Sequence, residues 1–256
     1  MKKMLIMAAA ALFMISCGSD DSSPVTNNDT VLVKKITETD EDGTLITVLT
    51  YNGTKLTEIN NNEGLRQVFI YAGDLITEWK TYQGTELITT DTYVYNSANK
   101  LVTYTSIDNT EEAYHEKITY VHNADGSIDY KEYNGNTPSS IDQLNMVGKI
   151  YADKYTEVVS FGAESITYTV TFTFDGKNNP LKNVTGFDKI AFVNTMESTN
   201  HAENITSETS SASNSTSAPK LQTTYVYTYD AKNYPLTVVE TDVEDPNTTI
   251  TTQYAY

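Results

Sequence analysis

A dense run of carboxylates near the start of the chain could do metal chemistry. Glu38 and residues 40–42 precede Gly43, and Ca²⁺ favours several carboxylate oxygens around a tight glycine turn. Aligned on the EF-hand pattern, however, the position of the bidentate Glu falls on Leu49, and the flanking residues alternate as strands do. The run therefore predicts an acidic hairpin turn, and we expect no metal site here.

Histidines and paired carboxylates are the next candidates. His115 and His122 are seven residues apart, so on one strand they would point to opposite faces, and His201 lies in a Ser/Thr-rich tract. Glu111 and Glu112 form a pair that so acidic a composition would produce anyway. No phosphate loop, Gly-x-Ser-x-Gly elbow or His-Glu-x-x-His motif is present. We therefore expect a non-enzymatic protein without cofactor, metal or catalytic residues.

The chain has one cysteine, Cys17, directly after an apolar run. Lys2 and Lys3 precede that run, Met4 to Ile15, which has the form of a secretory signal. It is too short for a hydrocarbon core that needs about 20 residues. One Cys excludes an intramolecular disulfide and a Cys-based zinc site.

The sequence Met-Ile-Ser-Cys that ends at Cys17 resembles the lipobox of bacterial lipoproteins. In that family the leader is cut before the Cys, whose sulfur takes a diacylglycerol and whose new amino terminus is acylated. The resemblance implies a signal peptide over residues 1–16 and lipidation of Cys17, and the alternative is a plain secretory leader. Several acyl chains anchor a protein stably where one does not.

Residues 17–30 are polar and acidic and predict a flexible tether. Within them Asp20 and Asp21 resemble the surface-export signal of Bacteroidota lipoproteins, which implies display on the outer face of the outer membrane; the alternative is a periplasm-facing lipoprotein. Asp29-Thr30-Val31 resembles the O-glycosylation acceptor of periplasmic and surface proteins in that phylum, which implies modification of Thr30.

The charge balance excludes one class of partner. The chain carries 34 acidic and 17 basic side chains, a net charge of −17, whereas binding nucleic acid needs a surplus of cations. Loss of residues 1–16 would remove two lysines and no acid, which makes the net charge −19. Anionic lipid headgroups repel such a surface, so we expect the lipid anchor alone to hold the protein at the membrane.

From Val31 to Tyr256 the sequence alternates with a period of two, which predicts an all-β domain. In Ile166–Phe174 the odd-numbered residues are all Thr and the others are apolar or aromatic, the pattern of a strand with one buried face. Short Gly turns separate such runs and predict a meandering antiparallel sheet of successive hairpins. These turns are Asp42-Gly43, Asn52-Gly53, Ala72-Gly73, Gln83-Gly84, Asp125-Gly126, Asn134-Gly135 and Asp175-Gly176.

Five of the hairpins share a signature, an aromatic residue before the turn and a Leu after it. They are Tyr51–Leu56, Tyr71–Leu75, Tyr95–Leu101, Phe174–Leu181 and Tyr229–Leu236. Tyr-Thr-Tyr-Asp at 227–230 is distantly similar to the YD repeats of secreted bacterial shell proteins. The Tyr-rich hairpins resemble uncharacterised surface lipoproteins of Bacteroidota more closely. One-hairpin units gain stability by pairing with their neighbours.

Two insertions interrupt the hairpins. Near 137–149, a capping box at Ser140 and the spacing of Ile141, Leu144 and Val147 predict a short helix. Near 185–220, Phe187 and Ile190 begin a second helical pattern, and the Ser/Thr-rich stretch of residues 198–219 predicts a disordered loop.

The 19 tyrosines favour a packed sheet face, although an aromatic row also suits a glycan or peptide ligand. We expect a lipid-anchored protein of the outer membrane and cell surface that acts as a binding or envelope-structural module, with the ligand unidentified. The alternative is a lipid-anchored hydrolase or glycan-processing protein whose site is assembled across the hairpins and the 185–220 insertion.

Overall fold

The computed structural model describes residues 30–110, 114–161, 164–193, 202–215 and 217–256. In these residues it contains sixteen strands and one short 3₁₀ helix. They are β1 Lys35–Thr39, β2 Thr44–Asn52, β3 Lys55–Asn61, β4 Leu65–Ala72, β5 Leu75–Gln83, β6 Glu86–Tyr95, β7 Leu101–Asp108, β8 His115–His122, β9 Ile128–Gly135, β10 Gln143–Ile150, β11 Lys154–Phe161, β12 Glu164–Phe174, η1 Phe187–Lys189, β13 Ile205–Ala212, β14 Lys220–Tyr229, β15 Pro235–Asp242 and β16 Thr249–Ala255.

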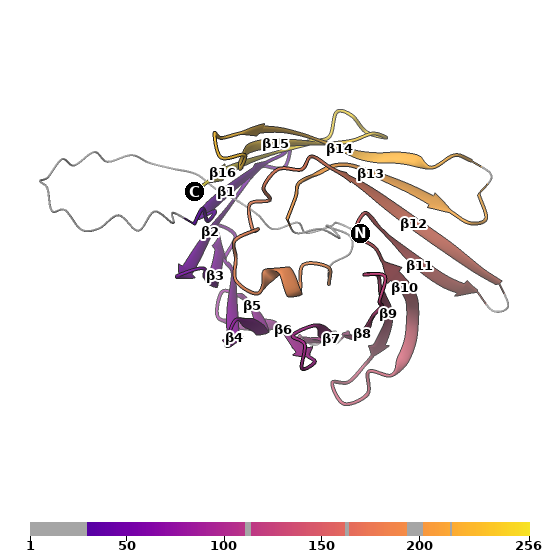
Figure 1. Cartoon of the computed structure of the whole chain (residues 1–256). Helices are drawn as coiled ribbons and strands as arrows, with labels where there is room; N and C mark the ends of the chain where they lie inside the picture. The colour runs from indigo at the N-terminus through magenta and orange to yellow at the C-terminus, as the bar shows by residue number, and fades with distance from the viewer. Residues whose placement is uncertain (1–29, 111–113, 162–163, 194–201, 216) are drawn as a thin grey trace, which may run out of the picture.

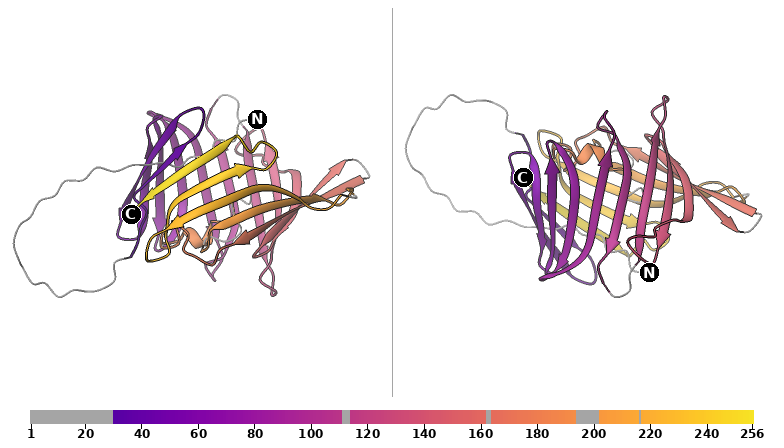
Figure 2. Two further views of the ribbon diagram at one scale, coloured as in Figure 1. Left: turned by 90° about the horizontal axis from the view of Figure 1, so that it is seen from above. Right: turned by 90° about the horizontal axis from the view of Figure 1, so that it is seen from below.

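The strands form one closed barrel in chain order (Figures 1 and 2). Each strand pairs antiparallel with its neighbours in sequence, and β1 closes the ring by pairing with β16 over Lys35–Thr39. The predicted all-β meander of hairpins is therefore confirmed, and the sheet is closed rather than open. No helix in the described part of the chain is long and apolar enough to cross a membrane.

Alternation along each strand divides the barrel into an inner and an outer face. On β12 the partners of Val170 and Phe172 are Ser210 and Glu208 of β13, and Phe172 is buried while Thr173 beside it is exposed. The predicted division of this strand into an apolar and a threonine face is confirmed. Most of the buried apolar residues of the inner face belong to one core cluster.

The aromatic-turn-Leu signature lies at one end of the barrel. Leu56 and Leu101 are each 1% exposed, and the hydroxyl of Tyr51 donates to the carbonyl of Val33 at 2.7 Å. Tyr95 makes the equivalent bond to Ile76, and His122 occupies the same place with its ring nitrogen 2.7 Å from the carbonyl of Leu101. At two of the five hairpins the signature thus supplies a buried Leu and a Tyr bonded to the backbone of an earlier segment, whereas Leu236 of the last hairpin is 42% exposed.

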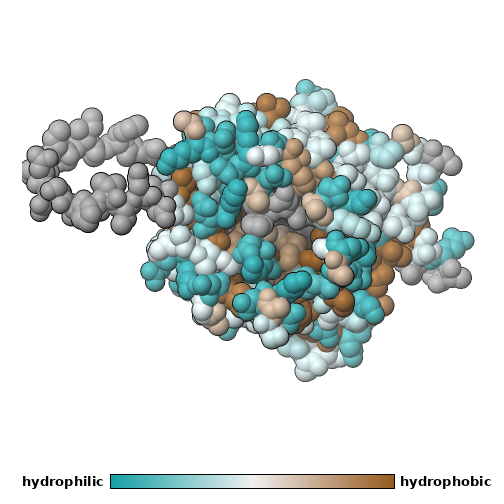
Figure 3. Space-filling view, in the orientation of Figure 1, coloured by the Kyte–Doolittle hydropathy of each residue, from teal (hydrophilic) through white to brown (hydrophobic). Residues whose placement is uncertain are grey.

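The segment of residues 175–193, here called the plug, lies across the same end inside the ring of strands (Figure 1). Val184 and Ile190 are buried in the main core cluster. Thr185 donates its backbone N–H to Thr54 at the β2–β3 turn, 3.0 Å away, and Asn178 donates to the carbonyl of Lys232 at the β14–β15 turn. Figure 3 shows this end, with polar side chains around its rim and apolar ones toward its centre.

The far end of the plug contacts a third part of the wall. The ring of Phe192 lies edge-on to Tyr120 at 5.2 Å between centroids and to His122 at 6.1 Å. Gly186 has φ +79°, and a Cβ there would lie 2.5 Å from the carbonyl oxygen of Asp74. Glycine is therefore required where the plug meets the β4–β5 turn.

Most of the predicted Gly turns have the expected geometry. Glycines 43, 53, 73, 84, 126 and 176 all have positive φ. Asn134-Gly135 is an exception, because Gly135 ends strand β9 and a Cβ there would lie 1.9 Å from the carbonyl oxygen of Ser140. This glycine permits a close approach of two backbones rather than a turn.

The short helix predicted near Ile141–Val147 is wrong. Gln143–Ile150 is strand β10, which pairs with β9 and β11 and has a bulge between Leu144 and Met146. Ile141 is buried, as a helix face would require, but it lies against Gly135 at the start of this hairpin. Two ladders of backbone hydrogen bonds outweigh a helix of two turns, which is marginal by itself.

The disordered loop predicted over residues 198–219 is also wrong in its described part. Ile205–Ala212 is strand β13, bonded to β12 on one side and β14 on the other. Ladder hydrogen bonds on both sides order this polar stretch without extensive apolar burial. The helical pattern that starts at Phe187 yields only the 3₁₀ turn η1 within the plug.

The predicted signal peptide (1–16) and most of the tether (17–30), with Cys17, Asp20 and Asp21, lie outside the described residues. They stay predictions. Thr30, the predicted glycosylation site, is the first described residue and is exposed.

Candidate functional site: the acidic wall of the barrel

Four carboxylates stand on the inner face of neighbouring strands and are here called the acidic wall: Asp91 on β6, Glu116 on β8, Glu132 on β9 and Glu157 on β11. Each shares the inward parity of buried residues on its own strand. Glu116 lies two residues before buried Ile118, and Glu132 two residues after buried Tyr130. All four are half-buried, so water still reaches them.

The backbone register connects these side chains. Asp91 pairs with Ser106, Ser106 with Glu116, and Glu116 with Asn134, which gives one polar row across β6 to β9. At the bulge of β10, Asn145 donates its amide N–H to Glu132 at 2.5 Å. The strands therefore hold the carboxylates in a fixed arrangement without a loop.

Burial and neighbouring negative charge raise the pKa of members of the wall. Burial, and then the negative charges of Glu132 and Asp91, raise the pKa of Glu116 to about 7. Burial and the charge of Glu132 raise the pKa of Glu157, and burial raises the pKa of Asp91. The wall therefore concentrates negative charge that the protein itself neutralises poorly.

No cation of the protein faces this wall in the described residues. Strands β5 to β11 carry their lysines at outward positions, paired in register with outward residues. Lys149 forms an ion pair with Asp129 at 3.3 Å, and Lys117 lies over the ring of Tyr133 at 5.0 Å, both outside the barrel. None of the ion pairs between described residues joins a member of the wall. The lysines of these strands therefore lie on the outer face of the barrel.

Tyrosines alternate with the carboxylates on the inner face. Tyr104 donates its hydroxyl to Asp91 at 3.1 Å, and Tyr130 donates to Glu157 at 3.5 Å. Gly148 makes room for Tyr130, since a Cβ there would lie 2.4 Å from the Cζ of that ring. The surface is both anionic and aromatic.

Three buried polar atoms of the described residues on this face, along β5 to β11, have no hydrogen-bond partner. Tyr120 is 5% exposed and pairs with Tyr130, and its hydroxyl is unbonded. Burial, and then the nearby Tyr104, Glu116, Tyr130 and Glu132, raise its pKa, which places the hydroxyl among the carboxylates. The indole N–H of Trp79, opposite Asp91 on β5, and Oδ1 of Asn134, opposite Glu116, are also unbonded. Buried polar groups usually have partners, so these three atoms mark places where a ligand could bond.

The candidates from the sequence lie elsewhere. His122 faces the plug, and His115, on the opposite face as predicted, is 1% exposed with neither ring nitrogen bonded. Asp40 uses its carboxylate to accept the N–H groups of Asp42 and Gly43 in the β1–β2 turn. In the described part of the chain no group of three or more His, Cys, Asp or Glu is placed to hold a metal ion.

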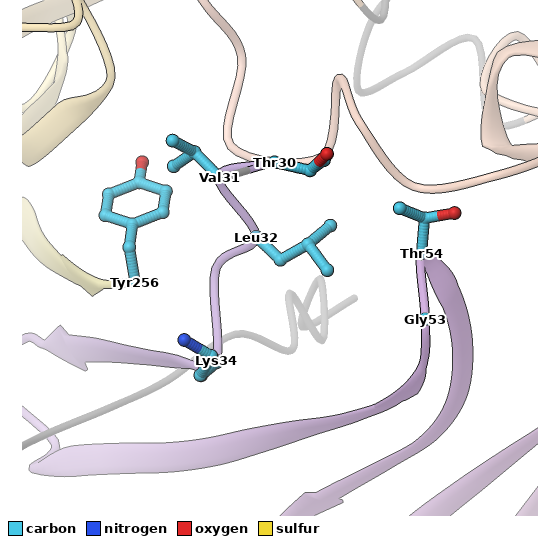
Figure 4. A pocket seen from close by; sticks show the side chains of 7 residues that line it. All are labelled: Thr30, Val31, Leu32, Lys34, Gly53, Thr54 and Tyr256. Atoms are coloured by element: carbon cyan, nitrogen blue, oxygen red, sulfur yellow. The ribbon is translucent and has the colours of Figure 1, made fainter. Parts of the chain in front are cut away.

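A pocket of about 480 Å³ lies at the plugged end, on the other side of the ring from the acidic wall (Figure 4). Thr30, Val31, Leu32 and Tyr256 line it together with the β2–β3 turn, and Lys34 supplies its one charge. Its lining begins at the first described residue, and it has no convergent polar groups.

The sequence contained a signal for the acidic wall that the motif search missed. Glu116, Glu132 and Glu157 each share a strand parity with buried Ile or Tyr neighbours, where an outward carboxylate would have the opposite parity. A charged residue in the core-facing register is unusual enough to mark a site. Which of these positions lie side by side, however, depends on strand pairing.

Comparison with known proteins adds no family. No family model matches the chain, and no curated protein matches it.

Proposed function

We propose that this protein is a lipid-anchored, non-enzymatic binding module of the outer membrane and cell surface, whose ligand is held against the inner wall of the barrel. One observation carries the proposal: along β5 to β11 the inner face of the closed barrel carries unneutralised carboxylates, tyrosines and three unbonded polar atoms among the described residues. Clefts with a few convergent polar groups and perturbed pKa values are the default binding sites of proteins.

The plug supports this proposal because it gives the barrel a floor. Its apolar residues fill one end, and Phe192 at its far end lies edge-on to Tyr120, which shares the inner face with the acidic wall. A barrel that is apolar at its plugged end and polar along one part of its inner face is suited to retain a ligand. The lipobox resemblance at Cys17 supports the membrane anchor.

The single tryptophan provides the test. Trp79 is the one Trp of the chain, lies on the inner face, and packs on Phe69 at 4.6 Å between ring centroids. Full-length protein titrated with panels of oligosaccharides, peptides and amines should show a saturable change of Trp79 emission with at least one ligand class. The absence of a saturable response in every class would overturn the binding function.

Localisation is tested separately. Cys17→Ala should move the protein from the membrane fraction to the soluble fraction, with Ser16→Ala as the matched control that keeps the cysteine. Protease added to intact cells should degrade the wild type if it is displayed at the surface. Degradation only after lysis would favour the periplasm-facing alternative.

A hydrolase remains the second candidate function for one reason. A carboxyl group with a pKa of about 7, as burial and neighbouring acids produce at Glu116, is suited to general acid catalysis. Release of reducing sugar from a glycan panel by the wild type, abolished in Glu116→Gln but kept in the outer-face variant Glu78→Gln, would establish this function in place of the first.

A further inference from the structure

We propose that the acidic wall binds a linear aliphatic polyamine, with its ammonium groups on the carboxylates and its methylene chain along the ring of Tyr104. This inference rests on the proposed binding function and adds the chemical class of the ligand.

The negative charge of the acidic wall favours a cationic ligand. The wall joins four carboxylates over β6 to β11, and the lysines of these strands face outward. A cation is the partner that relieves the mutual repulsion of Asp91, Glu116 and Glu132. The unbonded hydroxyl of Tyr120, 95% buried among these groups, offers a lone pair to an N–H donor.

The spacing of the carboxylates excludes a single metal ion as the ligand. A divalent metal draws several oxygens to 2.3–2.6 Å, and no such group of acids exists among the described residues. The wall instead extends over five strand intervals, and the three carboxylates from Asp91 to Glu132 span three of them, which at about 4.8 Å each gives roughly 14 Å. Charges spread along a line match a ligand that carries several separated cations.

Aromatic side chains select for ammonium groups on a hydrocarbon chain. Tyr104 and Tyr130 bond through their hydroxyls to Asp91 and Glu157, so their ring positions are held. The ring of Tyr104 is half-buried, whereas those of Tyr120 and Tyr130 are each 5% exposed and belong to the core cluster. Cations are attracted to aromatic faces, and methylene groups gain from apolar contact with the exposed part of the Tyr104 ring.

Binding should also release protons. The charges around Glu116 favour its protonated form near neutral pH, and an ammonium group beside it favours the ionised form. Affinity is therefore expected to rise with pH from 6 to 8, and the number of protons released is expected to fall over the same range.

Isothermal titration calorimetry of the full-length protein in detergent, with spermidine at low ionic strength and pH 8, tests the proposal. Saturable binding is expected, and butylamine, with one charge, should bind at least tenfold more weakly. Glu116→Gln with Glu132→Gln should lower spermidine affinity at least tenfold. The control, Glu78→Gln with Asp129→Asn, removes two outer carboxylates that pair with lysines and should change affinity less than twofold.

A milder variant distinguishes a loss of binding from a loss of folding. Tyr120→Phe removes only the unbonded hydroxyl and should lower spermidine affinity severalfold while near-UV circular dichroism is unchanged. No binding by the wild type, or equal losses in the inner and outer double variants, would overturn the proposal. A saturable Trp79 response to a neutral oligosaccharide without one to spermidine would overturn the polyamine and leave the binding function intact; no response to any class would overturn both.

Discussion

Glu116 allows the strongest test of the structure without any ligand. Its pKa rises from 4.5 to about 7 because of burial and the charges of Glu132 and Asp91. The native state thus holds the proton more tightly than the unfolded chain does, so native stability is favoured at low pH and is lost as the pH rises through 7. At about 1.4 kcal/mol per pKa unit, discounted for a half-buried group, the loss is about 2–3 kcal/mol.

The variant Glu116→Gln cannot ionise and should escape this loss. Its free energy of unfolding minus that of the wild type, measured by urea denaturation, should therefore grow by about 2–3 kcal/mol between pH 4.5 and pH 8.5. Taking this difference cancels the other titrating groups. Glu86→Gln, which removes an exposed glutamate at the start of β6, serves as the control.

A flat difference for Glu116→Gln, or one that shrinks as the pH rises, would refute the inward placement of this carboxylate. The same outcome would remove the electrostatic basis of the acidic wall, because Glu116 interacts with both Asp91 and Glu132.

Three further predictions concern the barrel. Gly148→Ala places a Cβ 2.2 Å from the carbonyl oxygen of Thr156 and should lower the free energy of unfolding, measured by urea denaturation, by about 3 kcal/mol. The control Gly53→Ala, whose positive φ is strained but whose surroundings are open, should lower it by about 1–2 kcal/mol. Equal losses in the two variants would contradict the packing at Gly148. Ile190→Ala should remove about 2–4 kcal/mol because this plug residue is 4% exposed, whereas Val94→Ala on the outer face should change stability by less than about 0.5 kcal/mol; a neutral Ile190→Ala would show that the plug does not pack. Deletion of residues 198–219 removes β13 from the ring and should abolish cooperative thermal unfolding followed by circular dichroism, and a melting temperature within a few degrees of the wild type would show that β13 is dispensable.

Local patterns in the sequence predicted many of the strands and turns of the barrel. The alternation in Ile166–Phe174 assigned the two faces of β12 correctly, since side-chain direction along a strand has a period of two whatever the strand pairs with. The glycine turns marked most hairpins for a similar reason, because positive φ is a local requirement.

Predictions failed where long-range pairing outweighed local preference. The capping box at Ser140 and the spacing of Ile141 to Val147 fit a helix, but two neighbouring strands make this stretch β10. The Ser/Thr-rich residues near Ile205 looked too polar to fold, yet both edges of β13 are bonded to other strands. Partners that lie far away in the sequence decided both cases.

The sequence by itself determined the class of the fold, the two faces of strands such as β12 and most of the hairpin turns, because each depends on neighbours within a few residues. Only the tertiary structure decided that β1 pairs with β16, that residues 175–193 enter the barrel as a plug, and that Asp91, Glu116, Glu132 and Glu157 share one surface. Ring closure and register set which inward residues become neighbours, and neither is encoded in any single hairpin. Alternation alone would assign these carboxylates to a core, and strand pairing brings them onto one face of the closed barrel.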